Sequence, residues 1–210
     1  MPQPVKVQLV MDVICVHSYL GYTRFARAAD RLRAEGLPVA VEFLPFELAP
    51  GAPPDERPLL EVLEQTFGPQ AAAGVLTFAE RAADEGLRLE YGKAIATGTF
   101  DAHRLIADAA HQGKAEPMAE RLFRAHFTDG LHIGDPATLA RLAAEVGITT
   151  GHVPAAELRA RLARVRRLGI TSVPVFLIEN LAPLTGSQTE TTLLAVLRQA
   201  ATLKGEHRDH

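Results

Sequence analysis

A cysteine, a histidine and a serine lie within four positions near the start of the chain, as Cys15-Val16-His17-Ser18. An apolar, β-branched run from Val5 to Ile14 ends at the cysteine, and an amphipathic stretch follows it. This order predicts a sulfur at the N-terminus of a helix, where unpaired backbone N–H groups and the helix dipole stabilise an anion. His17 can add a positive charge. The pattern therefore predicts that Cys15 is a reactive thiolate, although a lone cysteine is more often a small buried apolar residue.

The position of a second active-site thiol is occupied by Ser18, and Cys15 is the only cysteine of the chain. Ser18 can donate a hydrogen bond to a thiolate, but it cannot attack a mixed disulfide. Because a second thiol must resolve such an intermediate, the resolving thiol has to come from outside the chain. Glutathione is the expected candidate, as a co-substrate and not as a tightly bound cofactor.

Alternation and helical spacing predict a β-α-β unit at the N-terminus. Val5 to Ile14 and Pro38 to Leu48 are the predicted strands, and Tyr19 to Glu35 is the helix between them, with Gly36 as its stop. A parallel, right-handed crossover is the default for such a unit. The expected fold class is therefore α/β.

From about residue 58 to residue 168, the chain contains residues typical of helix starts and stops and no convincing strand. Strands return at Val173 to Ile178 and Leu181 to Thr185, which predict a hairpin, and Ser187-Gln-Thr-Glu190 predicts a capping box for the last helix. We therefore expect a discontinuous α/β domain of residues 1–50 and 152–210, interrupted by a helical insertion of residues 51–151.

Composition excludes several functions. The net charge of −3 and the sequence pI of about 6.2 give no electrostatic case for nucleic acid or an anionic membrane as partner. No apolar run is long enough to span a bilayer, and the first residues do not have the pattern of a signal peptide. The histidines lack metal-ligand spacing, so no metal site is expected. With one cysteine and no such signal, the sequence predicts a cytoplasmic protein.

Three stretches carry a resemblance to a known family. They are Met11-Asp-Val-Ile-Cys-Val-His-Ser-Tyr-Leu-Gly21, Gly98-Thr-Phe-Asp-Ala-His-Arg-Leu105 and Gly169-Ile-Thr-Ser-Val-Pro-Val-Phe176. With the order of elements, they resemble the thioredoxin fold with the helical insertion of the DsbA-like superfamily. The likeness is greatest to the cytoplasmic DsbA-like group first noted in frenolicin biosynthesis. That group neighbours the hydroxychromene-carboxylate isomerases and the kappa-class glutathione transferases.

The resemblance implies further site residues. It implies a cis peptide bond between Val173 and Pro174, with the backbone of Val173 facing the substrate beside the cysteine. It also implies that Gly186, Ser187 and Gln188 receive the γ-glutamyl carboxylate of glutathione, as a Gly-Ser-Asp segment does in the kappa class.

Two departures from the family pattern stand out. Cys15-Val16-His17-Ser18 replaces the Cys-Pro-x-Cys of dithiol members, and Gly98 replaces an asparagine of the subfamily. From the residues themselves, Asp12 is expected to be either a buried acid that assists proton transfer or a solvated edge residue.

Three functions remain open from the sequence. The first is a thiol-disulfide oxidoreductase with Cys15 as nucleophile, acting on a small thiol or a disulfide-bearing substrate. The second is a glutathione-dependent isomerase or transferase, in which glutathione supplies the reacting sulfur and Ser18-Tyr19-Leu20 matches the relatives. The third is a binding protein without turnover. The resemblance is also compatible with a homodimer.

Overall fold

The computed structural model describes residues 3–52 and 56–206. The chain divides into two compact units: unit 1 comprises Met1–Phe46 and Ala160–His210, and unit 2 comprises Glu47–Arg159. The expected domain division at 50/51 and 151/152 stays a prediction. The boundary between the two compact units at Arg159 and Ala160 falls within a continuous helix, α7 (Ala155–Arg167).

A four-stranded sheet forms the centre of unit 1, in the order β2-β1-β3-β4. Its strands are β1 (Val5–Met11), β2 (Val39–Pro45), β3 (Val175–Ile178) and β4 (Leu184–Thr185). β1 and β2 are parallel, as the β-α-β prediction requires, and β3 pairs antiparallel with both β1 and β4. The predicted hairpin is therefore present, with shorter strands than expected.

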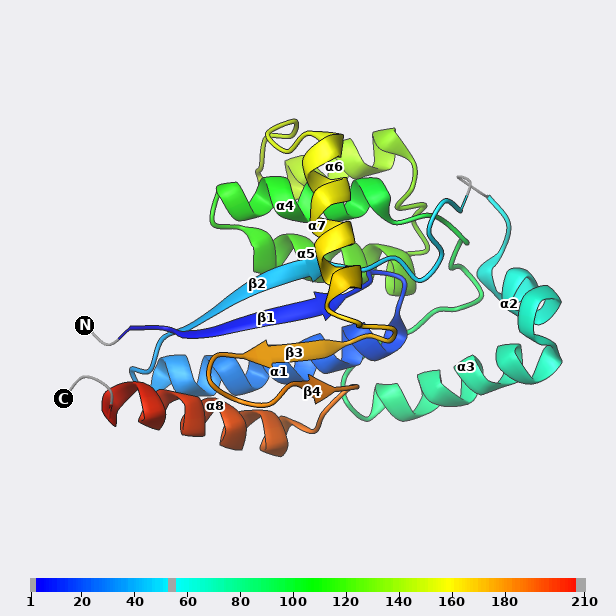
Figure 1. The fold of residues 1–210 in the computed structure, drawn as a ribbon. Coiled ribbons are helices and arrows are strands. Elements are labelled where there is room, and N and C mark those ends of the chain that lie inside the picture. Colours follow the sequence, from blue (N-terminus) through cyan, green and yellow to red (C-terminus); the bar gives the residue numbers. More distant parts are fainter. Residues whose placement is uncertain (1–2, 53–55, 207–210) are drawn as a thin grey trace. The chain divides into compact units, whose positions relative to one another are not determined.

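Two helices pack together on one face of this sheet, α1 (Val16–Ala34) and α8 (Glu190–Glu206) (Figure 1). α1 begins at Cys15, which is its N-cap residue. The helix ends before Gly36, whose φ of 80° lies in the left-handed region that glycine adopts without strain. Phe25 of α1 and Phe176 of β3 are fully buried with ring centroids 5.9 Å apart, so they help to hold α1 against the sheet.

All the named elements of unit 2 are helices. They are α2 (Leu59–Phe67), α3 (Pro69–Ala83), α4 (Phe100–His111), α5 (Ala115–Arg124), the π-helix η1 (Ala125–Asp129), α6 (Pro136–Val146) and the first part of α7. Asp135 caps α6 by accepting a hydrogen bond from the Thr138 N–H at 2.7 Å, and Gly147 ends the helix at φ 70°. Both ends of α6 therefore have residues typical of helix boundaries.

Within the described residues, the structure contains no helix that is both long and apolar enough to cross a membrane.

Candidate active site

Cys15 lies where β1 has ended and α1 begins. It has extended φ and ψ of −91° and 111°, its N–H donates to Asp12 O at 3.0 Å, and its carbonyl accepts from the Tyr19 N–H at 3.0 Å. The thiol does not cap the helix, and the residue is only 8% exposed. The first-turn N–H groups and the sulfur are thus close together, in a buried part of unit 1.

Two groups lie near the sulfur. The thiol donates to the backbone carbonyl of Val173, with a Sγ to O distance of 3.7 Å. The Ser18 hydroxyl has no hydrogen-bond partner in the described part of the chain, but it lies near enough to the sulfur to lower the pKa of the Cys15 thiol. Ser18 itself is fully buried. Since a buried hydroxyl needs a partner, the Ser18 hydroxyl is placed to donate to the sulfur when Cys15 is a thiolate.

Burial raises the pKa of the Cys15 thiol above its ordinary value. The Ser18 hydroxyl and the backbone N–H groups of Ser18 and His17 act in the opposite direction, and the charge of Asp12 adds a small rise. The expectation of a lowered pKa from the helix position alone is therefore not met by the structure. Loss of hydration outweighs the donors, because a thiolate loses more hydration on burial than a neutral thiol does.

His17 is exposed on the first turn of α1. Its effect on Cys15 comes from its backbone N–H. The expected contribution of the imidazole charge to the thiolate remains a prediction.

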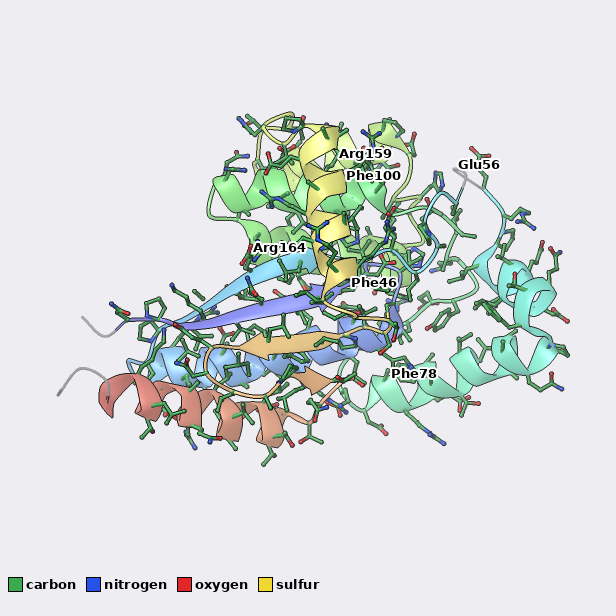
Figure 2. All side chains as sticks on the ribbon, in the orientation of Figure 1. Phe46, Glu56, Phe78, Phe100, Arg159 and Arg164 are labelled. Carbon is green, nitrogen blue, oxygen red and sulfur yellow. The ribbon has the colours of Figure 1, made fainter. Side chains whose placement is uncertain are left out.

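The Val173–Pro174 peptide bond is cis, the isomer that the family resemblance implies. Cys15 and Val173 belong to one apolar cluster, whose other buried members are Val10, Leu44, Val165 and Val175. Phe46, which directly follows β2 and is labelled in Figure 2, packs against this cluster, as does Ile170. Residues from β1, β2, β3 and α7 therefore surround the sulfur with hydrocarbon, which is the physical cause of the raised pKa.

The segment Gly186-Ser187-Gln188 is a turn between β4 and α8 that adjoins the proline loop. The Gly186 N–H donates to Pro174 O at 2.8 Å, and Gly186 has a φ of 85°, so the turn requires glycine at this position. Ser187 and Gln188 are half-buried. The structure thus brings the predicted carboxylate-binding residues next to Pro174, on the same unit as Cys15.

The predicted capping box at the start of α8 is wrong by two residues. Thr189, not Ser187, is the cap: its hydroxyl accepts from the Thr192 N–H at 3.1 Å. Glu190 is instead the first residue of α8 and pairs with Arg31 at 3.0 Å. The Ser187 hydroxyl is thereby left without a capping role.

Asp12 is fully buried just after β1, which excludes the solvated-edge alternative. Its carboxyl group acts on Cys15 through charge, and its backbone carbonyl accepts the Cys15 N–H. A role in proton transfer remains a prediction.

Gly21 and Arg24 of α1 are site residues that the sequence analysis missed. A Cβ on Gly21 would lie 3.0 Å from Pro174 Cγ and 3.4 Å from Ser187 Cα, so the helix backbone approaches both loops. Arg24 donates from Nη1 to the carbonyls of Ser187 and Gln188 at 3.0 and 3.2 Å. A glycine within a helical pattern is a signal for close packing, whereas nothing local indicates the acceptors of Arg24.

In unit 2, the structure explains the departure at Gly98. A Cβ there would lie 2.9 Å from Ala52 O, so the loop at Ala52 occupies the space that an asparagine side chain would need. Arg159 of the basic α7 helix stacks over the Phe100 ring at 5.4 Å, also within unit 2 (Figure 2). Among the described residues, the structure contains no group of three or more potential ligands that could hold a metal ion.

Unit 1 combines a β-α-β unit with a β-hairpin and a final helix. Its cysteine lies at the N-terminus of the first helix, beside a cis-proline. These features define a protein of the thioredoxin fold class. The chain belongs to the DSBA-like thioredoxin domain family, whose model matches residues 6–198.

Solved structures with a similar fold include a probable DsbA oxidoreductase from Streptomyces coelicolor. It is 29% identical with a TM-score of 0.76, over 93% of this chain and 89% of that chain. The cytosolic disulfide reductase DsbM from Pseudomonas aeruginosa, solved with GSH, is 22% identical with a TM-score of 0.57, over 97% and 100% of the two chains.

A 2-hydroxychromene-2-carboxylate isomerase is 13% identical with a TM-score of 0.55, over 97% of this chain and 98% of that chain. These last two likenesses show the fold alone. No curated protein matches this sequence.

Proposed function

We propose that the protein is a thiol-disulfide oxidoreductase that works through one nucleophilic cysteine, Cys15, and uses an external thiol such as glutathione. The observation that carries the proposal is the surroundings of the sulfur. Ser18, where a resolving cysteine would stand, is buried and its hydroxyl lowers the pKa of Cys15, and the Val173 carbonyl beside the cis-proline is 3.7 Å from Sγ.

The proposed cycle has two exchange steps. The Cys15 thiolate attacks one sulfur of a disulfide, forms a mixed disulfide with it and releases the other sulfur as a thiolate. An external thiolate then attacks the substrate sulfur of the mixed disulfide and releases the Cys15 thiolate. Ser18 cannot perform the second step, because a hydroxyl does not exchange with a disulfide.

The raised pKa sets the pH dependence of this cycle. At neutral pH a small fraction of Cys15 is thiolate, and a thiolate of higher pKa is intrinsically more nucleophilic. We therefore expect the rate of the first step to rise with pH until the pH exceeds the raised pKa of Cys15.

Substrate contacts are proposed from the loops around the sulfur. The backbone of Val173 would pair with an extended peptide or with glutathione, as in strand addition. The turn of Gly186, Ser187 and Gln188 would take the γ-glutamyl carboxylate, because the adjoining N-terminus of α8 is favourable for an anion. The proline loop and this turn are joined by the bond from the Gly186 N–H to Pro174 O.

Intact-mass spectrometry tests the proposal. Wild-type protein incubated with oxidised glutathione should gain one glutathione on Cys15, and added reduced glutathione should remove it with catalytic turnover. The Cys15→Ser variant should do neither. Wild-type protein that forms no adduct, even at a pH where a buried thiol ionises, would rule out the proposed nucleophile.

The second candidate function is a glutathione-dependent isomerase or transferase. The burial of Cys15 and its raised pKa favour it, since a mainly neutral thiol can orient a glutathione thiolate without attacking. The Cys15→Ser variant separates the two candidates: it abolishes turnover by the first mechanism and retains it by the second. A protein that binds glutathione but shows no turnover in either form would be a binding protein.

We also propose a cytoplasmic location, where reduced glutathione is available to resolve the adduct. A small thiol or a disulfide-bearing molecule is the proposed partner.

A further inference from the structure

A row of three buried side chains crosses the sheet of unit 1. Leu44 of β2 and Val175 of β3 are both register partners of Val10 on β1. All three belong to the apolar cluster that contains Cys15, so the row lies on the face of the sheet that meets the sulfur. β1 points to the edge of the sheet at which α1 begins (Figure 1), and its chain leaves the sheet there to reach Cys15. The positions next to this row, on that edge, therefore decide what surrounds the sulfur.

Phe46 occupies the first of these positions, just beyond the end of β2. It follows Leu44 by two residues, so the two side chains lie on the same face of the strand. The Phe46 N–H donates to the carbonyl of Met11, the last residue of β1, at 3.0 Å, so the pairing of the two strands continues through Phe46. Its half-buried side chain packs against the cluster of Cys15. An aromatic ring is thus held beside the point where the chain turns towards Cys15.

Val173 occupies the corresponding position on the other side of Cys15. It precedes Val175 by two residues, and because β3 runs antiparallel to β1, this places Val173 towards the same edge as Phe46. Its carbonyl is 3.7 Å from the sulfur, and the exposed fraction of Cys15 is only 8%. The fully buried Ser18 hydroxyl, which has no hydrogen-bond partner in the described part of the chain, offers a donor to a thiolate within this narrow space. A substrate sulfur therefore reaches Cys15 between an aromatic ring and the cis-proline loop.

We infer that Phe46 is a specificity-determining residue, which restricts Cys15 to the disulfides of slender, linear molecules of low molecular weight. In disulfide exchange the thiolate sulfur forms a bond to one substrate sulfur while that sulfur loses its bond to the other, and the bond electrons leave with the departing thiolate. The three sulfurs are in line at that moment, so the group on the attacked sulfur must pass beside the Phe46 ring. A disulfide flanked by CH₂ groups in a linear tripeptide passes, whereas a disulfide in a folded protein, with two chain segments attached to each sulfur, does not. This inference rests on the proposed role of Cys15 as nucleophile.

Two uncharged methanethiosulfonates test the role of Phe46. The methyl reagent and the nitroxide spin-label reagent release the same methanesulfinate when a thiolate attacks them, and they differ in the size of the group that remains on the sulfur. The ratio of the two rate constants, methyl over spin label, does not depend on the thiolate fraction. Because the bulky group must displace the ring from its preferred rotamer, we expect this ratio to be about tenfold higher for the wild type than for free glutathione. Phe46→Ala should lower the ratio to the value of free glutathione, and Phe46→Leu should be intermediate, because leucine keeps an apolar side chain but lacks the ring.

Leu177→Ala is the matched control. Leu177 packs against the same cluster, but it pairs with Gln8, away from the end of β1 at which Cys15 lies, so its loss should leave the ratio of the wild type. The inference is overturned if the wild type has the ratio of free glutathione, or if Phe46→Ala keeps the ratio of Leu177→Ala. Should Phe46→Ala not fold, Phe46→Leu decides in the same way.

The outcome for Phe46 can be told apart from the outcome for the proposed function. If the ratio depends on Phe46 and oxidised glutathione forms no adduct on Cys15, the restriction by Phe46 stands and the proposed one-thiol mechanism fails. If the adduct forms and the ratio does not depend on Phe46, the mechanism stands and the inference fails.

Discussion

The Ser18→Ala substitution tests the balance of forces on the Cys15 sulfur. The Ser18 hydroxyl is fully buried, and it lowers the pKa of the Cys15 thiol against the effect of burial. A hydrogen bond to a charged group contributes about 1.5–3 kcal/mol, and one pKa unit corresponds to about 1.4 kcal/mol. Sulfur is a weak acceptor, so we take the lower end and expect the pKa of Cys15 to rise by about one unit.

The higher pKa has two opposing consequences for the alkylation rate. Below the pKa, the thiolate fraction falls about tenfold for each unit, while the nucleophilicity of that thiolate rises by the Brønsted coefficient of about 0.4–0.5. The net expectation is alkylation about threefold slower at neutral pH. At a pH above both pKa values, the same variant should react about threefold faster than the wild type.

The assay is the rate of Cys15 alkylation by iodoacetamide, followed by mass spectrometry from neutral to strongly alkaline pH. Ser172→Ala is the control, because Ser172 is exposed in the loop before Val173. The profiles of alkylation rate against pH for Ser18→Ala and for the wild type should cross. Profiles that coincide, or a variant that reacts faster at neutral pH, would show that the hydroxyl does not stabilise the thiolate.

Three further changes have defined outcomes. Ser18→Cys should allow an internal disulfide with Cys15, seen as the loss of two hydrogen masses on oxidation; a persistent glutathione adduct like that of the wild type would contradict this. Thr189→Ala should lower the unfolding free energy measured in urea by about 1 kcal/mol, whereas Ser187→Ala should not. A loss of stability in Ser187→Ala but not in Thr189→Ala would contradict the cap at Thr189 and support the capping box predicted from the sequence. Cys15→Ala should differ from the wild type by a constant unfolding free energy below about pH 8.5. As the pH rises towards the raised folded-state pKa, the wild type should lose the stability that its protonated thiol contributes. A difference that stays constant in alkali would contradict the raised pKa.

Local patterns in the sequence were sufficient for most elements of unit 1. The alternation in β2, the apolar spacing of α1 and the stop at Gly36 are properties of neighbouring residues, and the structure has each of them. The position of Cys15 at a helix start follows from the same kind of information. The family resemblance supplied Pro174, because the isomer of an X–Pro bond is not encoded in a local pattern.

The error at the start of α8 shows where local patterns fail. Ser187 and Thr189 are both hydroxyl residues ahead of an apolar run, so the sequence offers two possible caps. The pairing of Val175 with Thr185 and the left-handed conformation of Gly186 decide where the hairpin ends. The helix then begins after Thr189, because the chain needs the intervening residues for the turn.

The sequence by itself determined that one thiol stands at the N-terminus of a helix without a resolving partner, because residue type and helix position are local facts. Only the tertiary structure decided the state of that thiol. Val165 and Val173 are distant in sequence from Cys15, yet they bury it and raise its pKa. The same holds for Arg24, whose acceptors are more than 160 positions away. Hydration and hydrogen-bond partners depend on which segments pack together, and no window of neighbouring residues contains that information.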